Sequence, residues 1–223
     1  MTLYSWPART VFGRVIPKSR IYQGAGASRS VQAKFVEQID RMEWTHVLRA
    51  DTLNLRPSKD VEEIAVVAIV LHSSEVDQAV LAAIEKAIPR PLILELSHRG
   101  RTRMAAAWKR PSLAEAGKWV TAAHVYSSWV PAKSPRQPLP ATLDMAALYA
   151  ALLDPLLPAK RAPSEPIASR VARSEEAAQI KGEISRLEAG LKREKQFNKK
   201  VEINAALRAA NDRLSRLLGG GDG

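Results

Sequence analysis

The chain of 223 residues contains no cysteine, and this absence excludes several kinds of chemistry. Without thiols there is no disulfide framework, no thiolate nucleophile and no cysteine-containing zinc site. The phosphate-binding patterns GxxxxGK[ST] and GxGxxG and the hydrolase pattern GxSxG are also missing. Residues 1–21 break their apolar runs with proline and basic residues, so they predict neither a signal peptide nor a membrane span. We therefore expect a cytoplasmic protein that binds no membrane and needs no cofactor.

Acidic residues are also scarce relative to basic ones. Lysine and arginine number 34 against 23 aspartates and glutamates, which gives a formal charge of +11. Such an excess favours a polyanionic partner, because counterions are released from the phosphate backbone on binding. Arginine-rich proteins from genomes of high GC content carry a similar excess without touching nucleic acid, and the composition leaves both interpretations open.

Proline is concentrated in two stretches, residues 131–140 and 155–166, which must be loops or linkers. The second stretch is the predicted boundary between two parts of the chain. We expect an α+β domain over residues 1–154, a Pro-rich linker over 155–166, a basic coiled-coil helix over 167–218 and a frayed tail over 219–223.

Helical and strand patterns mix before the linker. The run EIAVVAIVL is too continuously apolar to have a wet face and predicts a central strand. Two further runs flank Arg99 and Gly100, which is good spacing for a β-hairpin. Together the patterns predict helices over 30–42, 74–88 and 142–153 and strands over 43–50, 63–71, 92–97, 102–108 and 119–129. This order predicts the α+β class, with a mixed or antiparallel sheet covered by helices.

The segment after the linker contains no proline from residue 168 to residue 218 and carries two apolar seams with coiled-coil spacing. The seams are out of phase, so the segment is either one helix with a skip in its supercoil or a helical hairpin that turns near Lys195, Asn198 and Lys199. The seams predict pairing with a partner helix, or self-association into a homo-oligomer, through Ile180, Ile184, Leu187, Leu191, Ile203, Leu207, Leu214 and Leu217.

Basic residues gather around the predicted β-hairpin. Alternation along a strand puts Arg101 and Arg103 on one face, at a spacing able to follow phosphates. The predicted nucleic-acid contacts are Arg99, Arg101, Arg103, Lys109 and Arg110. Tryptophans nearby in the sequence are either stacking platforms for bases or core anchors. A solvated edge that deters strand pairing is the competing interpretation of the arginines.

The residues that would build a catalytic or metal centre are poorly represented. The four histidines are spaced evenly at 26 residues, but no two stand at the short spacing of a metal site. A metal-dependent nuclease would have to use Glu63 and Glu95, and the lysine that usually accompanies such carboxylates is missing. We therefore expect no metal site and no catalytic residues, and expect Glu95 to face solvent or pair with Arg101, Arg103 or Lys109.

Four segments of the sequence resemble one bacterial family. They are PKSRIY at 17–22, Trp44 followed by TLNL at 52–55, KRPS at 109–112 and, most specifically, REKQFNKKVEIN at 193–204. These segments resemble the domain of unknown function 4391 family. The resemblance implies no catalytic residues; it implies a setting beside helicase-like ATPases and DNA methyltransferases in restriction or phage-defence loci.

The resemblance and the composition lead to one expected function and two alternatives. We expect a non-catalytic accessory subunit of a DNA-processing or phage-defence assembly that binds a helicase or methyltransferase partner and also DNA. The alternatives are a metal-dependent nuclease using Glu63 and Glu95 and a stand-alone nucleic-acid-binding module.

Overall fold

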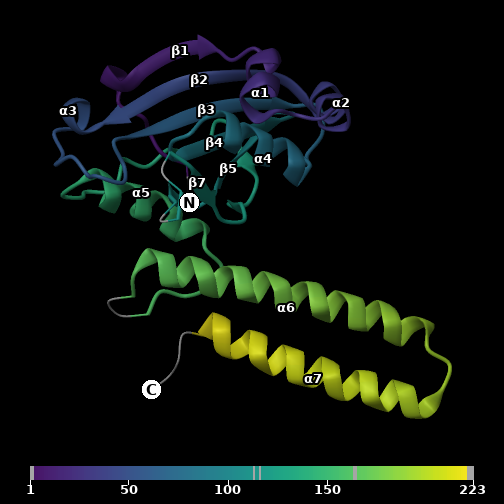
Figure 1. The fold of residues 1–223 in the computed structure, drawn as a ribbon. Coiled ribbons are helices and arrows are strands. Elements are labelled where there is room, and N and C mark those ends of the chain that lie inside the picture. Colours follow the sequence, from purple (N-terminus) through teal and green to yellow (C-terminus); the bar gives the residue numbers. More distant parts are fainter. Residues whose placement is uncertain (1–2, 113, 116, 163–164, 220–223) are drawn as a thin grey trace. The chain divides into compact units, whose positions relative to one another are not determined.

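A mixed, mostly antiparallel sheet of seven strands organises the first part of the chain (Figure 1). The structure, a computed structural model, describes residues 3–112, 114–115, 117–162 and 165–219. The sheet contains β1 (Val11–Val15), β2 (Ile39–Arg49), β3 (Glu63–Leu71), β4 (Leu92–His98), β5 (Arg101–Ala106), β8 (Val125–Tyr126) and β9 (Val130–Pro131). Strands β1 to β5 follow one another across it, β3 and β4 pair in parallel, and β8 and β9 both pair with β5.

Helices cover both faces of this sheet, which confirms the α+β class. One core packs the sheet against α1 (Lys18–Ala25), α2 (Arg29–Gln38) and α4 (Gln78–Ala87). A second core packs the opposite face against α5 (Met145–Leu153) and the start of the chain. Strand β3 is apolar from Ile64 to Leu71 because its alternate side chains enter the two cores, with Val66 in one and Val67 in the other.

Short polar side chains begin the helices and a glycine brings two of them together. Ser28, Asp77 and Asp144 cap the first turns of α2, α4 and α5 by accepting backbone N–H bonds. A Cβ atom at Gly24 in α1 would lie 3.1 Å from the Cβ of Ala87 in α4. Glycine at this position therefore lets the two helices approach closely.

Some of the helices and strands agree with those predicted from the sequence, and others differ. The structure confirms the strand over 63–71 and the β-hairpin that turns at Arg99 and Gly100. The predicted helix over 30–42 ends at Gln38, because β2 already begins at Ile39. The single strand predicted over 119–129 is wrong: β7 (Trp119–Thr121) pairs with β6 (Lys109–Pro111) in a separate ribbon, and β8 begins only at Val125.

Three elements before β3 were not predicted at all, nor were the short strands β6 and β9, and short 3₁₀ segments complete this part of the chain. Strand β1 and helix α1 fall in residues for which no element was assigned from the sequence. The third is the short helix α3 (Ala50–Leu53), which follows β2 directly. The 3₁₀ segments are η1 (Ala8–Thr10) and η2 (Asp154–Leu156).

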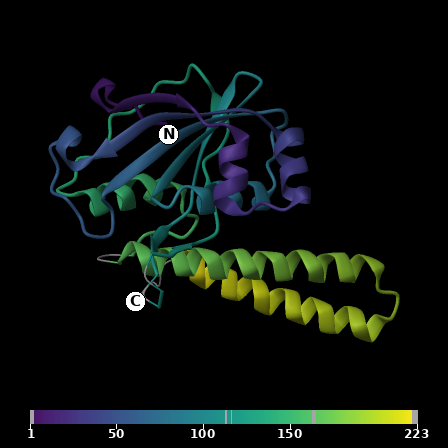
Figure 2. The ribbon, with the colours of Figure 1, turned by 45° about the horizontal axis from the view of Figure 1, so that its top comes forward.

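Residues 157–223 form a second compact unit, built around two long helices. Helices α6 (Ile167–Arg193) and α7 (Phe197–Gly219) run in opposite directions and pack against each other (Figure 1, Figure 2). The turn at Glu194–Gln196 confirms the hairpin alternative. Of the predicted frayed tail, Gly219 ends α7 and the rest lies outside the described residues.

Both predicted seams lie inside this helical hairpin. Their eight residues are buried or half-buried, whereas the positions between them are mostly exposed, as expected for the sides by which α6 and α7 pack together. Arg213 and Glu183 add an ion pair of 2.7 Å between the helices. Arg173 of α6 donates to the carbonyl of Leu217, near the C-terminal end of α7.

Candidate functional site

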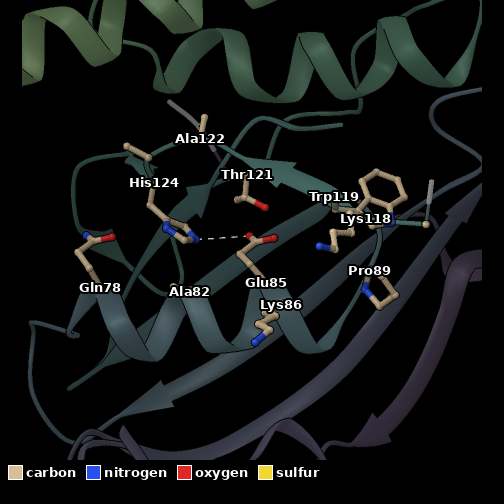
Figure 3. Close-up of a pocket in the computed structure, with 12 residues that line it drawn as sticks. Gln78, Ala82, Glu85, Lys86, Pro89, Lys118, Trp119, Thr121, Ala122 and His124 are labelled. Atoms are coloured by element: carbon tan, nitrogen blue, oxygen red, sulfur yellow. Dashed lines mark ion pairs between the residues drawn. The ribbon is translucent and has the colours of Figure 1, made fainter. Parts of the chain in front are cut away.

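A cavity of about 660 Å³ lies between α4 and residues 117–124 (Figure 3). We call it the Glu85 cavity. Its walls are largely apolar and include Ala82, Pro89 and Trp119. Lys86 and Lys118 also line it and are exposed.

The polar groups at this cavity form a buried ion pair. Lys109 Nζ lies 2.9 Å from Glu85 Oε2, and both side chains are almost completely buried, at 1% and 2% exposure. The same ammonium donates to the backbone carbonyls of Glu85, at 2.5 Å, and of Ile88, at 2.6 Å. All three N–H donors of Lys109 are therefore used, two of them on carbonyls at the C-terminal end of α4.

A tyrosine completes this network. The hydroxyl of Tyr149 accepts the backbone N–H of Lys109 at 3.1 Å and donates to the carbonyl of Ala107 at 2.5 Å. Burial, with the Glu85 carboxylate as a second cause, raises the pKa of Tyr149 well above its ordinary value, so the phenol stays a neutral donor. Burial also lowers the pKa of Lys109, and the Glu85 carboxylate opposes that effect.

His124 faces the second carboxylate oxygen of Glu85. Its Nε2 lies 3.4 Å from Glu85 Oε1, and Figure 3 shows the two side chains pointing toward each other. Neither atom has a hydrogen-bond partner, and neither is open to solvent. The Glu85 carboxylate is therefore buried, and its main contact is Lys109. This arrangement is typical of an ion pair that holds two elements of a fold together.

A second hollow, of about 630 Å³, lies between β1, α1, Trp44 of β2 and the end of α4. We call it the N-terminal groove. Phe12, Ile21 and Trp44 line it together with Arg14 and Arg20. The Phe12 and Trp44 rings lie 5.2 Å apart, and the Arg14 guanidinium lies 4.8 Å from the centre of the Phe12 ring.

Sequence reasoning missed this groove although a signal was present. The first 36 residues contain six lysines and arginines and no acidic residue, and both β1 and α1 fall within them. A local absence of acids is a stronger indication of a basic surface than the charge of the whole chain.

A third feature is the end of the helical hairpin, residues 192–201, which we call the helical tip. Phe197 is 77% exposed and Val201 is 53% exposed. Residues 192–200 contain five lysines and arginines and one acid, Glu194. Glu194 accepts the backbone N–H groups of Lys195 and Gln196, and these bonds lower the pKa of its carboxyl.

The predicted nucleic-acid contacts differ in how exposed their side chains are. Lys109 is wrong as a surface contact, because it is enclosed with Glu85. Arg103 is largely used in packing, with its guanidinium 4.5 Å from the Tyr126 ring and 4.7 Å from the Trp129 ring. Arg99, Arg101 and Arg110 are exposed, and Arg101 donates to the carbonyl of Trp129.

The two carboxylates of the nuclease alternative are not brought together. Glu63 pairs with Arg49 and Arg90, and Glu95 receives both guanidinium nitrogens of Arg136 at 2.7 and 3.0 Å. Glu95 is level with Ala68 in the neighbouring strand, so it lies about 16 Å along the sheet from Glu63. Strand alternation also turns the two side chains to opposite faces.

The prediction that Glu95 forms an ion pair is therefore confirmed, but its partner is Arg136 and none of the three residues proposed. Trp6 also donates to this carboxylate, at 2.8 Å. Among the described residues, no group of three His, Asp or Glu side chains is placed to hold a metal ion.

The eight seam residues were predicted to bind a partner helix, and the structure places them between α6 and α7 instead. The two seams cover each other because the chain folds back at Glu194–Gln196. Within the part of the chain that the structure describes, none of the helices is both long and apolar enough to span a bilayer.

Together, the fold and these sites define an α+β protein with a helical-hairpin extension and two surfaces on which aromatic and basic side chains meet. The chain belongs to the family described as Domain of unknown function (DUF4391), whose model matches residues 5–214. Comparison with curated proteins and with solved structures gives no match.

Proposed function

We propose that this protein is a non-catalytic accessory subunit of a bacterial DNA-processing or phage-defence assembly, and that its helical hairpin docks onto a helicase-like ATPase or a DNA methyltransferase. The observation that carries the proposal is the helical tip. Phe197, at 77%, is the most exposed of the large hydrophobic side chains in the described residues. An aromatic ring left this open, with a second apolar side chain one helical turn away, is typical of a contact surface.

The charge of the second unit supports the same position. Residues 192–200 carry a formal charge of +4, whereas the remainder of residues 157–223 contains nine basic and eight acidic residues. The positive charge of this unit is thus concentrated around Phe197. We propose that the partner offers an apolar pocket with an acidic rim, since such a surface complements an exposed ring surrounded by lysines.

Pairing of the seams within the chain limits how a partner can bind. A partner helix inserted along Leu187 or Leu214 would have to displace α6 or α7 from its neighbour. A partner that contacts the tip leaves that packing intact. The most specific segment of the family resemblance, residues 193–204, also spans this tip.

Affinity purification of the tagged full-length chain from its host tests the proposal. Bound proteins would be identified by mass spectrometry for the wild type, for Phe197→Asp with Val201→Asp, and for Leu143→Asp. Leu143 is a matched control, because it is 74% exposed and lies in the first unit. We expect a helicase-like ATPase or a methyltransferase with the wild type and with Leu143→Asp, and its loss with the tip variant.

Two results would contradict the proposal. One is recovery of the same ATPase or methyltransferase with all three proteins, which would exclude the tip. The other is magnesium- or manganese-dependent DNA cleavage by the purified chain that Glu63→Gln or Glu95→Gln abolishes without unfolding, which would support the nuclease alternative.

A further inference from the structure

We infer that the N-terminal groove binds single-stranded nucleic acid, with an unstacked base against Phe12 and Trp44 and the phosphate backbone against Arg14 and Arg20. This site is separate from the proposed docking surface and from the β-hairpin arginines. It goes beyond the proposed function, which names no residue that would touch nucleic acid.

The groove offers accessible aromatic surface. Phe12 is 39% exposed although its ring contacts Trp44, and all five residues of β1 are exposed. Burial of aromatic surface is favourable, so the exposed part of Phe12 favours a ligand that covers it. Bases do so without sequence preference, because every base has a π-face.

The irregular backbone of strand β1 disfavours pairing with another strand. It lies at the edge of the sheet, where a regular strand would invite pairing with a second chain. Its register with β2 shifts between Val11 and Arg14, and Gly13 between them has a φ of +62°. Such a bulge bends an edge strand and re-aims its side chains.

The charge at the groove is positive and is not neutralised by neighbours. The two walls, β1 and α1, belong to the acid-free first 36 residues. Glu43 precedes Trp44 on β2 and therefore points to the other face of the sheet. Arg90 stands over the Trp44 ring at 5.2 Å, and two acids lie near it. Glu63 pairs with both Arg49 and Arg90, and the Glu62 carboxylate also acts on Arg90, so two basic side chains balance these two acids.

These features favour a single strand over a duplex. In a duplex the base faces are stacked on one another, so no base is free to stack on Phe12 or Trp44, and only the arginines would contribute. DNA and RNA single strands both carry phosphates and unstacked bases, and these are the groups that the groove would contact in either strand.

Fluorescence anisotropy with labelled 15-nucleotide oligo(dT), oligo(U) and a 15-base-pair duplex tests the inference on the full-length protein. We expect binding of at least one single strand at 50 mM salt, and weaker binding of the duplex. Phe12→Ala should weaken single-strand binding about tenfold with little change in its salt dependence, and Phe12→Tyr should retain it. Arg14→Glu with Arg20→Glu should lower the slope of log affinity against log salt by about 1.4, the value for two phosphate contacts on a single strand.

Arg56→Glu with Lys133→Glu makes the same change in net charge at two exposed residues outside both the groove and the β-hairpin, and is the matched control. It should leave the single-strand affinity within about threefold of wild type, and circular dichroism should show every variant folded. Equal losses in both double variants would overturn the inference, because the binding would then follow net charge. Failure of the wild type to bind either single strand, or unchanged binding by Phe12→Ala, would also overturn it and return the groove to a protein-docking surface. None of these outcomes depends on the helical tip.

Discussion

Substitution of Lys109 by methionine should destabilise the first unit severely. Methionine keeps most of the length of the side chain but leaves the Glu85 carboxylate without its cation and the carbonyls of Glu85 and Ile88 without their donor. Loss of one partner from a buried ion pair costs about 3–5 kcal/mol. A domain of this size has about 5–15 kcal/mol in total, so the variant should approach the threshold of folding at 37 °C.

Urea unfolding followed by tryptophan fluorescence measures this effect on the full-length chain. All five tryptophans lie between residues 6 and 129, so their emission reports the first unit and not the helical hairpin. Lys86→Met is the matched control, because Lys86 is exposed and lies next to Glu85 on α4, and it should change the free energy of unfolding by less than about 0.5 kcal/mol. Adding Glu85→Gln to Lys109→Met should recover part of the loss, since the uncompensated charge is then gone. A cost below about 1 kcal/mol for Lys109→Met would refute the buried pair.

Three further predictions concern other parts of the chain. Burial lowers the pKa of His46 in the folded protein, so below pH 6.5 the unfolded chain binds more protons than the folded one. The free energy of unfolding should therefore fall on acidification, by at most about 1.4 kcal/mol per pH unit from this group. Urea titrations at several pH values measure this fall, and His46→Gln should make it less steep. Glu95→Gln should cost about 1–2 kcal/mol through its bonds to Arg136 and Trp6, and should leave oligonucleotide binding unchanged in the anisotropy assay. Removal of the residues after Pro166 should leave a folded α+β domain that no longer captures the partner; a truncated protein without a cooperative thermal transition would contradict this.

Apolar periodicity predicted the elements whose burial is complete and failed where exposure is high. Strand β3 was assigned residue for residue because both of its faces enter a core. Strand β1 has no buried face, so it leaves no alternation to read, and α1 is shorter than three turns. The N-terminal groove lies between these two elements and was missed with them.

The burial of charged residues was the hardest property to predict, because the residue type does not show whether a charged side chain is buried or exposed. Lys109 follows Trp108 in a run of basic residues and was assigned to the surface. Its burial depends on Glu85, which lies 24 residues earlier on a different element. Only the fold brings the two together, and no local pattern marks either residue as buried.

The helical hairpin shows what a seam can and cannot specify. Heptad spacing predicted which residues of α6 and α7 would be covered, and all of them are at least half-buried. Heptad spacing could not predict which helix would cover them, because a second helix of the same chain and a helix of a partner present the same apolar side chains. The phase shift between the seams was the one local sign of a turn, and the turn lies at Glu194–Gln196.

The most direct test of the docking role is a comparison of partner capture by wild type, Phe197→Asp with Val201→Asp, and Leu143→Asp under identical conditions. The account predicts that a helicase-like ATPase or a DNA methyltransferase binds the first and third proteins, and that the second loses at least about 90% of it, equivalent to about 1.4 kcal/mol. Capture of that partner by the tip variant at the wild-type level would contradict the account.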